Sequence, residues 1–115
     1  MTSVLFTAFS TRPDAQTLAH HAIAALTARG VASEFLPLDD HAEPACDADT
    51  LIVSLGGDGT FLRSARLAHH CGARVLAVNL GRVGFLLDVA ATDVVARVVD
   101  QRHQPRPVAL APGLH

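Results

Sequence analysis

The stretch LIVSLGGDGT, residues 51–60, decides how the rest of the chain is interpreted. Its first half, Leu51 to Leu55, is apolar except for one serine, which predicts a strand buried on both faces of a parallel sheet. Three glycines and an aspartate follow, and helical spacing predicts a helix from Phe61 to about His70. A buried strand that turns through glycines into a helix is typical of sheets that bind ligands at the carboxyl ends of their strands.

Outside this unit, strands and helices continue to alternate. The predicted segments are a strand at 3–8, a helix at 14–29, a strand at 34–38, a strand at 74–78 and a helix at 91–103 with Thr92 as its candidate N-cap. This order predicts an α/β fold with a three-layer, largely parallel sheet flanked by helices. We assign residues 1–103 to one α/β nucleotide-binding domain and 104–115 to a proline-rich tail that leads toward a missing second domain.

The composition excludes several classes of partner. The net charge is −2, all nine basic residues are scattered arginines, and Trp and Tyr are absent, so nucleic acid is not expected to bind. No apolar stretch is long enough to span a membrane, and no signal peptide is apparent. Cys46 and Cys71 are expected to be free thiols in a reducing compartment, so we predict a cytoplasmic protein. Only 17% of residues are charged, which favours self-association of the full-length protein.

The turn at 56–60 is the candidate functional site. Glycines let a phosphate approach the backbone, and the start of the following helix favours an anion. Asp58 would repel a phosphate in a loop that only stores one, but it is useful as a base or beside Mg²⁺ in phosphoryl transfer. The simplest alternative is a tight turn, since Asp-Gly is a common turn dipeptide. A dinucleotide fingerprint of the GxGxxG type fails, because Leu62 occupies the place of its third glycine.

These residues resemble a known family. Gly56 to Thr60 resembles the glycine-aspartate motif shared by NAD kinases, diacylglycerol and sphingosine kinases, and 6-phosphofructokinases. The helix continuation at 61–66 is similar to that of NAD kinases. Residues 78–86, VNLGRVGFL, resemble the second NAD kinase signature. The resemblance implies the nucleotide-binding N-terminal domain of an NAD kinase, an enzyme that makes NADP from NAD with ATP or polyphosphate. It also implies that a β-rich second domain is missing here.

The resemblance assigns roles to the first motif. Asp58 would be the catalytic base that activates the adenosine-ribose 2′-hydroxyl of NAD for attack on the terminal phosphate of the donor. Gly56, Gly57, Gly59 and Thr60 would lie against phosphates. The cofactor implied is Mg²⁺, or another divalent cation, carried with ATP. No side-chain metal site is expected, because the sequence has no HExxH, CxxC or similar ligand spacing.

The remaining predicted contacts lie beyond the turn. Arg63, one helical turn further on, would face the dinucleotide, and Phe85 would pack near its adenine end. Asn79, Gly81 and Gly84 would form the opposite wall of the site. Each has a structural alternative: Phe85 as core, Arg63 as a solvated helix residue, and the other three as turn residues.

Two rival functions remain open at this stage. One is a lipid kinase of the same superfamily, although the Gly84-Phe85-Leu86 sequence argues against it. The other is a non-catalytic nucleotide-binding or interaction module in which Asp58 only supports the turn.

The purified 115-residue chain is expected to form little or no NADP from NAD and Mg-ATP. Positioning the hydroxyl against the donor needs both walls of the site, and the NAD kinase resemblance places one wall in the missing domain. An NADP-specific enzymatic assay checks this. Robust turnover by the purified chain would contradict the expectation.

Overall fold

The computed structural model describes residues 3–39, 46–80 and 87–102. In these ranges, strands and helices follow the predicted order. They are β1 (Ser3–Ala8), α1 (Pro13–Ala28), β2 (Ser33–Pro37), β3 (Thr50–Gly56), α2 (Asp58–Cys71), β4 (Arg74–Asn79) and α3 (Leu87–Arg102). The proline-rich segment 104–115, and the predicted site residues Gly81, Gly84 and Phe85, lie outside the described residues.

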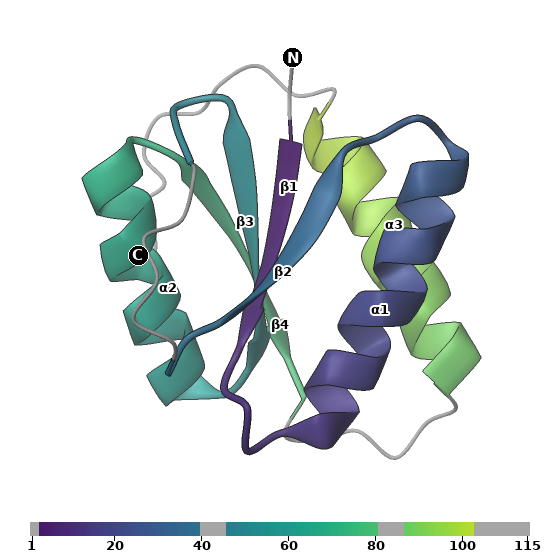
Figure 1. The fold of residues 1–115 in the computed structure, drawn as a ribbon, viewed down its shortest axis with the longest axis horizontal. Helices are drawn as coiled ribbons and strands as arrows, with labels where there is room; N and C mark the ends of the chain where they lie inside the picture. Colours follow the sequence, from purple (N-terminus) through teal and green to yellow (C-terminus); the bar gives the residue numbers. More distant parts are fainter. Residues whose placement is uncertain (1–2, 40–45, 81–86, 103–115) are drawn as a thin grey trace.

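The four strands form one parallel sheet in the order β2-β1-β3-β4. Helices α1 and α3 cover one face of the sheet and α2 covers the other, so the predicted three-layer α/β fold is confirmed (Figure 1). The chain turns from β1 toward β2 on one side and from β3 toward β4 on the other. Such a reversal of strand order opens a crevice at the carboxyl ends of the two central strands, which point downward in Figure 1.

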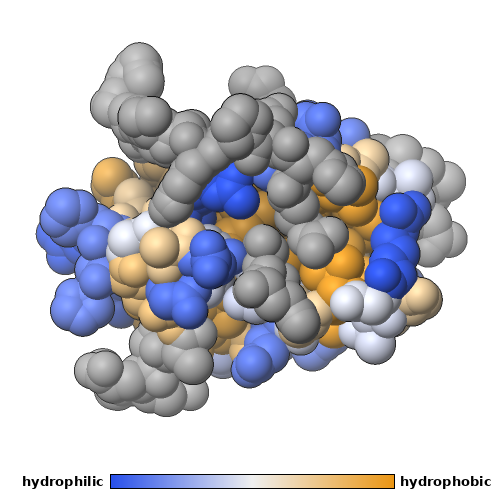
Figure 2. Space-filling view, turned by 90° about the horizontal axis from the view of Figure 1, so that it is seen from above, coloured by the Kyte–Doolittle hydropathy of each residue, from blue (hydrophilic) through white to orange (hydrophobic). Residues whose placement is uncertain are grey.

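Two apolar clusters of unequal size hold the layers together. The larger one fills the space between the sheet and helices α1 and α3, and Phe6, Val53 and Leu55 form its sheet side. The smaller one, around Leu5 and Ile52, lies under α2. Every residue of β3 is buried, as predicted for a parallel strand covered on both faces. Seen from the amino-terminal ends of the strands, hydrophilic residues lie at both sides of the molecule, and apolar and hydrophilic patches alternate between them (Figure 2).

Helix ends that depend on glycine were predicted well, and helix starts less well. Gly30 and Gly72 have φ values of 80° and 73° beyond the ends of α1 and α2, which is the left-handed geometry expected there. Helix α2, however, begins at Asp58 and not at Phe61. A carboxylate in the first turn interacts favourably with the helix dipole, so Asp58 joins the helix instead of ending a loop.

The start of α3 was also predicted too late. The helix begins at Leu87, so Thr92 lies inside it and is not its N-cap. The preference of threonine for N-caps is worth about 1 kcal/mol. The additional helical turn before Thr92 stabilises the helix by more than that preference, so the helix begins at Leu87.

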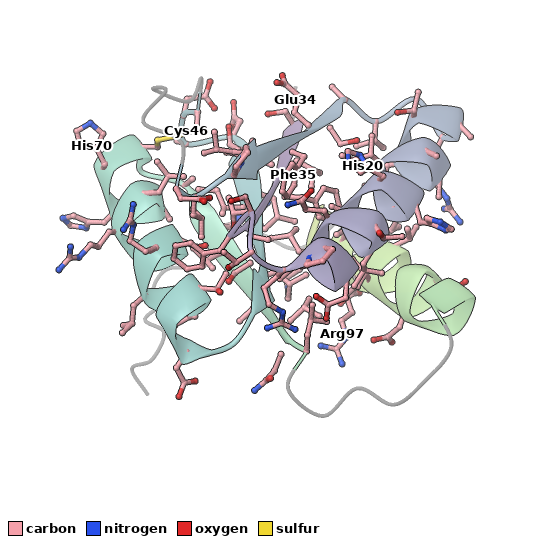
Figure 3. All side chains as sticks on the ribbon, turned by 60° about the horizontal axis from the view of Figure 1, so that its bottom comes forward. His20, Glu34, Phe35, Cys46, His70 and Arg97 are labelled. Carbon is pink, nitrogen blue, oxygen red and sulfur yellow. A yellow bond between two sulfur atoms is a disulfide. The ribbon has the colours of Figure 1, made fainter. Side chains whose placement is uncertain are left out.

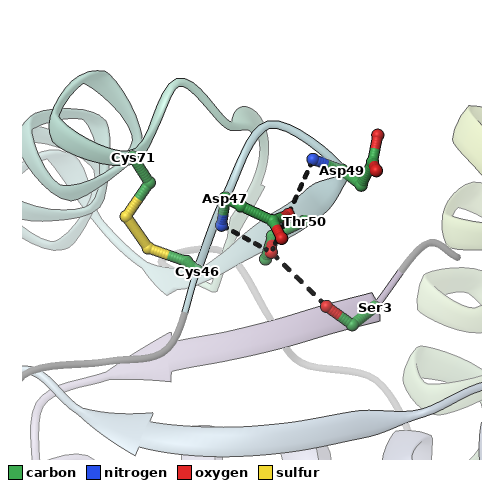
Figure 4. Close-up of a disulfide and its surroundings, with 6 residues drawn as sticks. All are labelled: Ser3, Cys46, Asp47, Asp49, Thr50 and Cys71. Carbon is green, nitrogen blue, oxygen red and sulfur yellow. Dashed lines mark hydrogen bonds between the residues drawn. A yellow bond between two sulfur atoms is a disulfide. The ribbon is translucent and has the colours of Figure 1, made fainter.

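Cys46 and Cys71 are joined by a disulfide, so the prediction of two free thiols was wrong (Figure 4). Their Cα atoms are 5.7 Å apart although the residues are 25 positions apart in sequence. The pairing follows from the fold: α2 runs antiparallel to β3, and its last residue therefore returns to the segment that precedes β3 (Figure 4). A separation in sequence alone does not reveal this return.

Across the described ranges, no helix has the length and apolar character needed to cross a bilayer.

A buried hydroxyl pair fastens α2 to the central strand β1. Thr7 Oγ1 lies 2.8 Å from Ser64 Oγ and donates to the carbonyl oxygen of Val53 at 3.2 Å. Replacing Thr7 with valine is expected to lower the free energy of unfolding by about 1–3 kcal/mol, because the buried Ser64 hydroxyl loses its acceptor. Urea unfolding followed by circular dichroism measures the change.

The double variant T7V/S64A is the matched control. It removes both polar groups, so it is expected to recover much of the loss seen in T7V alone. A double variant as unstable as the sum of the two single variants would mean that packing, not the hydroxyl pair, is responsible.

Candidate functional site

A hollow of about 200 Å³ lies at the carboxyl ends of β3 and β4, beside the start of α2. Figure 3 brings this end of the sheet forward. The lining residues come from β3 and its turn, from the first turn of α2 and from the end of β4: Ser54, Gly56, Gly57, Asp58, Phe61, Ala77, Val78 and Asn79. The structure therefore brings four predicted site residues together: Gly56, Gly57, Asp58 and Asn79.

The start of α2 presents backbone N–H groups at this hollow. Gly57 is the N-cap residue with no side-chain capping bond, and its carbonyl accepts the first helical bond, from Phe61 N at 3.0 Å. Helix geometry leaves the N–H groups of Asp58, Gly59 and Thr60 without an intrahelical partner. N–H groups in this position, at the positive end of the helix dipole, favour an anion.

Asp58 combines exposure with a place at the edge of this anion site. It is the first residue of α2, it is exposed to solvent, and it lines the hollow. A carboxylate there is stabilised by the helix dipole and remains open to a substrate hydroxyl. The geometry therefore places an exposed carboxylate beside an uncapped helix start.

The glycines of the turn serve two different purposes. A Cβ on Gly56 would lie 2.9 Å from Thr60 Cβ, and the φ of Gly56 is 158°, so this glycine is required by the close approach of β3 to α2. A Cβ on Gly57 or Gly59 would meet nothing within 4 Å, and neither residue has a positive φ. Nothing in the described fold demands glycine at these two positions, which leaves open space where a ligand can approach the backbone.

Two predicted residues take positions that the sequence did not reveal. The side chain of Thr60 is buried against Gly56, so only its backbone N–H belongs to the helix end. Arg63 does not line the hollow. Its Nη2 donates to the carbonyl oxygen of Leu38 at 2.9 Å, and its guanidinium lies 5.9 Å from the centroid of the Phe9 ring. Arg63 thus connects α2 to the loops that follow β1 and β2.

Asp39, which lies just after β2, orders the loop that follows β1. Asp39 accepts hydrogen bonds from the Ser10 hydroxyl and from the Ser10 N–H, the latter at 3.0 Å. The hydroxyl, the N–H and the nearby Arg63 charge hold the pKa of Asp39 below its usual value. Gln16 Nε2 adds a bond to the Ser10 carbonyl at 3.1 Å. These bonds hold the loop after β1 against the residue that follows Leu38, at the carboxyl edge of the sheet.

Sequence reasoning did not name Phe61 as a site residue, although it lines the hollow with Asp58. The two residues are three positions apart on α2, so they lie on one helix face. Starting the helix at Asp58 would have revealed this pairing. Ser54, Ala77 and Val78 also line the hollow, and their places follow from strand register, in which Gly56 pairs with Asn79.

No group of three or more His, Cys, Asp or Glu side chains that could hold a metal ion occurs within 3–39, 46–80 and 87–102. His20, one of the seven histidines, instead packs its ring against Phe35, with centroids 5.8 Å apart (Figure 3). Any divalent cation at the hollow would have Asp58 as its protein carboxylate among the lining residues. That suits Mg²⁺, which binds through few carboxylates and substrate phosphates.

The family model and the related proteins that match this chain carry the same name, NAD kinase. A family model described as the ATP-NAD kinase N-terminal domain matches residues 2–103. The NAD kinase of Mycobacterium bovis is 46% identical over 71 residues, covering 62% of this chain and 22% of the relative. The NAD kinase of Mycobacterium leprae is 44% identical over 85 residues, covering 68% and 26%. NAD kinase 1 of Streptomyces avermitilis is 68% identical over 44 residues, covering 38% and 12%. The matches thus cover at most 26% of these relatives' own lengths.

Substitutions at Gly56 and Gly59 are expected to distinguish a glycine that the fold requires from a glycine that leaves open space beside the backbone. Gly56→Ala should lower the free energy of unfolding by roughly 1–3 kcal/mol, because its Cβ would overlap the buried Thr60 side chain. Gly59→Ala should leave stability unchanged or raise it by up to about 1 kcal/mol, because alanine is the better helix former and its Cβ meets open space. Chemical denaturation of both variants tests the pair. Equal losses at the two positions would contradict the assignment.

Proposed function

This chain belongs to the ATP-NAD kinase N-terminal domain family, matched over residues 2–103, and from that premise we propose that it forms the phosphoryl-transfer wall of an NAD kinase. The proposed reaction transfers a phosphoryl group from ATP, or from polyphosphate, to the adenosine-ribose 2′-hydroxyl of NAD. The product is NADP. The whole reaction belongs to a longer enzyme in which this chain is the first domain.

One observation carries the proposal: an exposed carboxylate and an uncapped helix start meet at the same hollow. The N–H groups of residues 58–60 would bind phosphate oxygens, and the open space beside Gly57 and Gly59 would let the phosphates reach the backbone. A site that only stored phosphate would be weakened by the Asp58 charge. The carboxylate is therefore better explained as a participant in the chemistry.

Asp58 is proposed as the general base. Its carboxylate would accept the proton of the 2′-hydroxyl as that oxygen attacks the terminal phosphorus of the donor. The dipole of α2 and the N–H groups beside Asp58 would stabilise the charge that spreads over the phosphate oxygens. Mg²⁺ would arrive with the donor phosphates and would supply charge neutralisation there.

The opposite wall is proposed around the end of β4. Asn79 lines the hollow across from Gly56, its partner in strand register. Gly81, Gly84 and Phe85 follow it in sequence and are proposed, from the family motif, to shape the dinucleotide side.

Arg63 is proposed to contribute at the crevice between β1 and β3. Within the described residues, one of its N–H donors is bonded to Leu38, and the residue is exposed. The guanidinium can therefore hold its place through Leu38 and Phe9 while still offering positive charge toward the dinucleotide.

The cellular location and the self-association of the enzyme are also part of the proposal. NAD and ATP are abundant inside cells, so we place the protein in the cytoplasm. We propose that the full-length protein self-associates, since the low fraction of charged residues leaves much of its surface available for contacts. Membership in the family favours NAD over lipid acceptors, because the related proteins are named NAD kinases.

In a full-length enzyme that carries this chain as its first domain, Asp58→Asn is expected to lower kcat by about 10²–10⁴-fold. The amide keeps the size of the side chain but cannot take the proton, so the dissociation constant for NAD should change little. Steady-state NADP formation and calorimetric titration with NAD measure the two quantities.

Gly59→Ala in the same protein is the matched control. It is expected to weaken phosphate-dependent binding while sparing stability, since the added methyl group enters the space proposed for the ligand. An Asp58→Asn enzyme with full activity would leave a non-catalytic binding module as the better explanation. Phosphorylation of diacylglycerol or sphingosine in place of NAD would favour a lipid kinase.

A further inference from the structure

The disulfide encloses the whole unit that carries the candidate site. Cys46 stands before β3 and Cys71 is the last residue of α2, so the covalent ring contains β3, the Gly57 turn and α2 (Figures 3 and 4). The turn joins strand and helix at one end of this unit, and the disulfide joins them at the other.

The two ends of α2 are fastened to the sheet by different means. Near its start, α2 is held by the Gly56–Thr60 packing, by the bond from Arg63 to Leu38 and by the Thr7–Ser64 hydroxyl pair. Toward its end, Ala68 packs in the smaller apolar cluster, and the disulfide from Cys71 adds a covalent tie to the segment before β3. Reduction would therefore remove the covalent tie at the end of the helix, while its packing on the sheet and the contacts near its start stay in place.

Cys46 is held close to its partner by the turn that follows it. Asp47 N donates to Thr50 Oγ1 at 3.1 Å, and Asp49 N donates to Asp47 Oδ1 at 2.8 Å (Figure 4). Thr50 Oγ1 also lies 3.4 Å from Ser3 Oγ on β1. These bonds do not involve sulfur, so they keep the segment beside α2 after reduction, and the two thiols stay near enough to re-form the bond.

Both cysteines are half-buried, so small thiols can reach them. We propose that Cys46 and Cys71 form a thiol–disulfide exchange site through which low-molecular-weight thiols control the stability of the β3–α2 unit. In reduction, a thiolate of the small molecule attacks one cysteine sulfur, breaks the S–S bond and releases the other cysteine, which takes up a proton. A second small thiol displaces the first. The protein gains two electrons and two protons, and the small thiol leaves as its own disulfide.

The size of the effect follows from ring closure in the unfolded chain. Cross-linking residues 25 positions apart restricts the unfolded ensemble and stabilises the folded domain. The oxidised chain is expected to melt roughly 10 °C higher than the reduced chain. None of these quantities depends on nucleotide binding, so failure here would leave the proposed kinase function untouched, and failure of that function would leave this site untouched.

The test uses the purified chain in mixtures of reduced and oxidised glutathione, quenched by alkylation and measured by intact mass and thermal unfolding. Two species are expected, a dithiol that takes up two alkyl groups and an internal disulfide about 2 Da lighter that takes up none. Persistent glutathione adducts, or two reactive thiols under oxidising conditions, would overturn the proposal. So would equal melting temperatures in the two states.

Cys46→Ser and Cys71→Ser are the matched controls. Each should melt like the reduced wild-type chain and show no response to reductant. The double variant C46S/C71S has no thiol left to form a mixed disulfide, so a melting temperature that still shifts with glutathione in this variant would contradict the assignment. Because a variant can fail to fold, wild-type chain reduced and alkylated with a small reagent provides the same comparison without substitution.

Discussion

Strand β3 is hydrogen-bonded on both sides and buried on both faces. This position limits which residues the strand can contain and how the chain can leave it. Its backbone groups must pair with β1 and β4, and its side chains must be apolar or internally bonded. At its carboxyl end the chain has to leave the sheet at once and enter α2. Gly56 makes this possible, since any larger residue would collide with Thr60. The place of the helix start, and with it the place of Asp58, follows from this contact.

The helices on the two faces of the sheet are held in different ways. Helices α1 and α3 lie on the larger apolar cluster, which supplies most of the buried surface. Helix α2 lies on a small cluster and relies on specific ties: the Thr7–Ser64 pair, the Arg63 bond and the disulfide. A helix held by few, directional contacts can present its first turn at a defined position without a large apolar interface. The hollow at the carboxyl ends of β3 and β4 depends on that arrangement.

Much of the fold could be predicted because it depends on local patterns. Apolar runs marked the strands, helical spacing marked the helices, and Gly30 and Gly72 marked helix ends. The glycine-aspartate turn was placed at the correct edge of the sheet, with Asn79 beside it. Helix starts were missed because an aspartate in a first turn resembles a loop residue in sequence. The disulfide, the role of Asp39 at Ser10 and the contacts of Arg63 were missed because each joins segments distant in sequence. Such contacts follow from tertiary geometry, which local patterns do not encode.

The strand register also bears on the order in which this molecule assembles. Leu51 of β3 pairs with Arg74 of β4, and Ser3 of β1 pairs with Thr50 of β3. The second pair is separated by roughly twice as many residues as the first, so a longer loop must close to form it. Because closing a shorter loop costs less chain entropy, the β3–α2–β4 and β1–α1–β2 units are each expected to form before β1 pairs with β3. The β3–α2–β4 segment, which carries the candidate site, would then be formed before the sheet is completed.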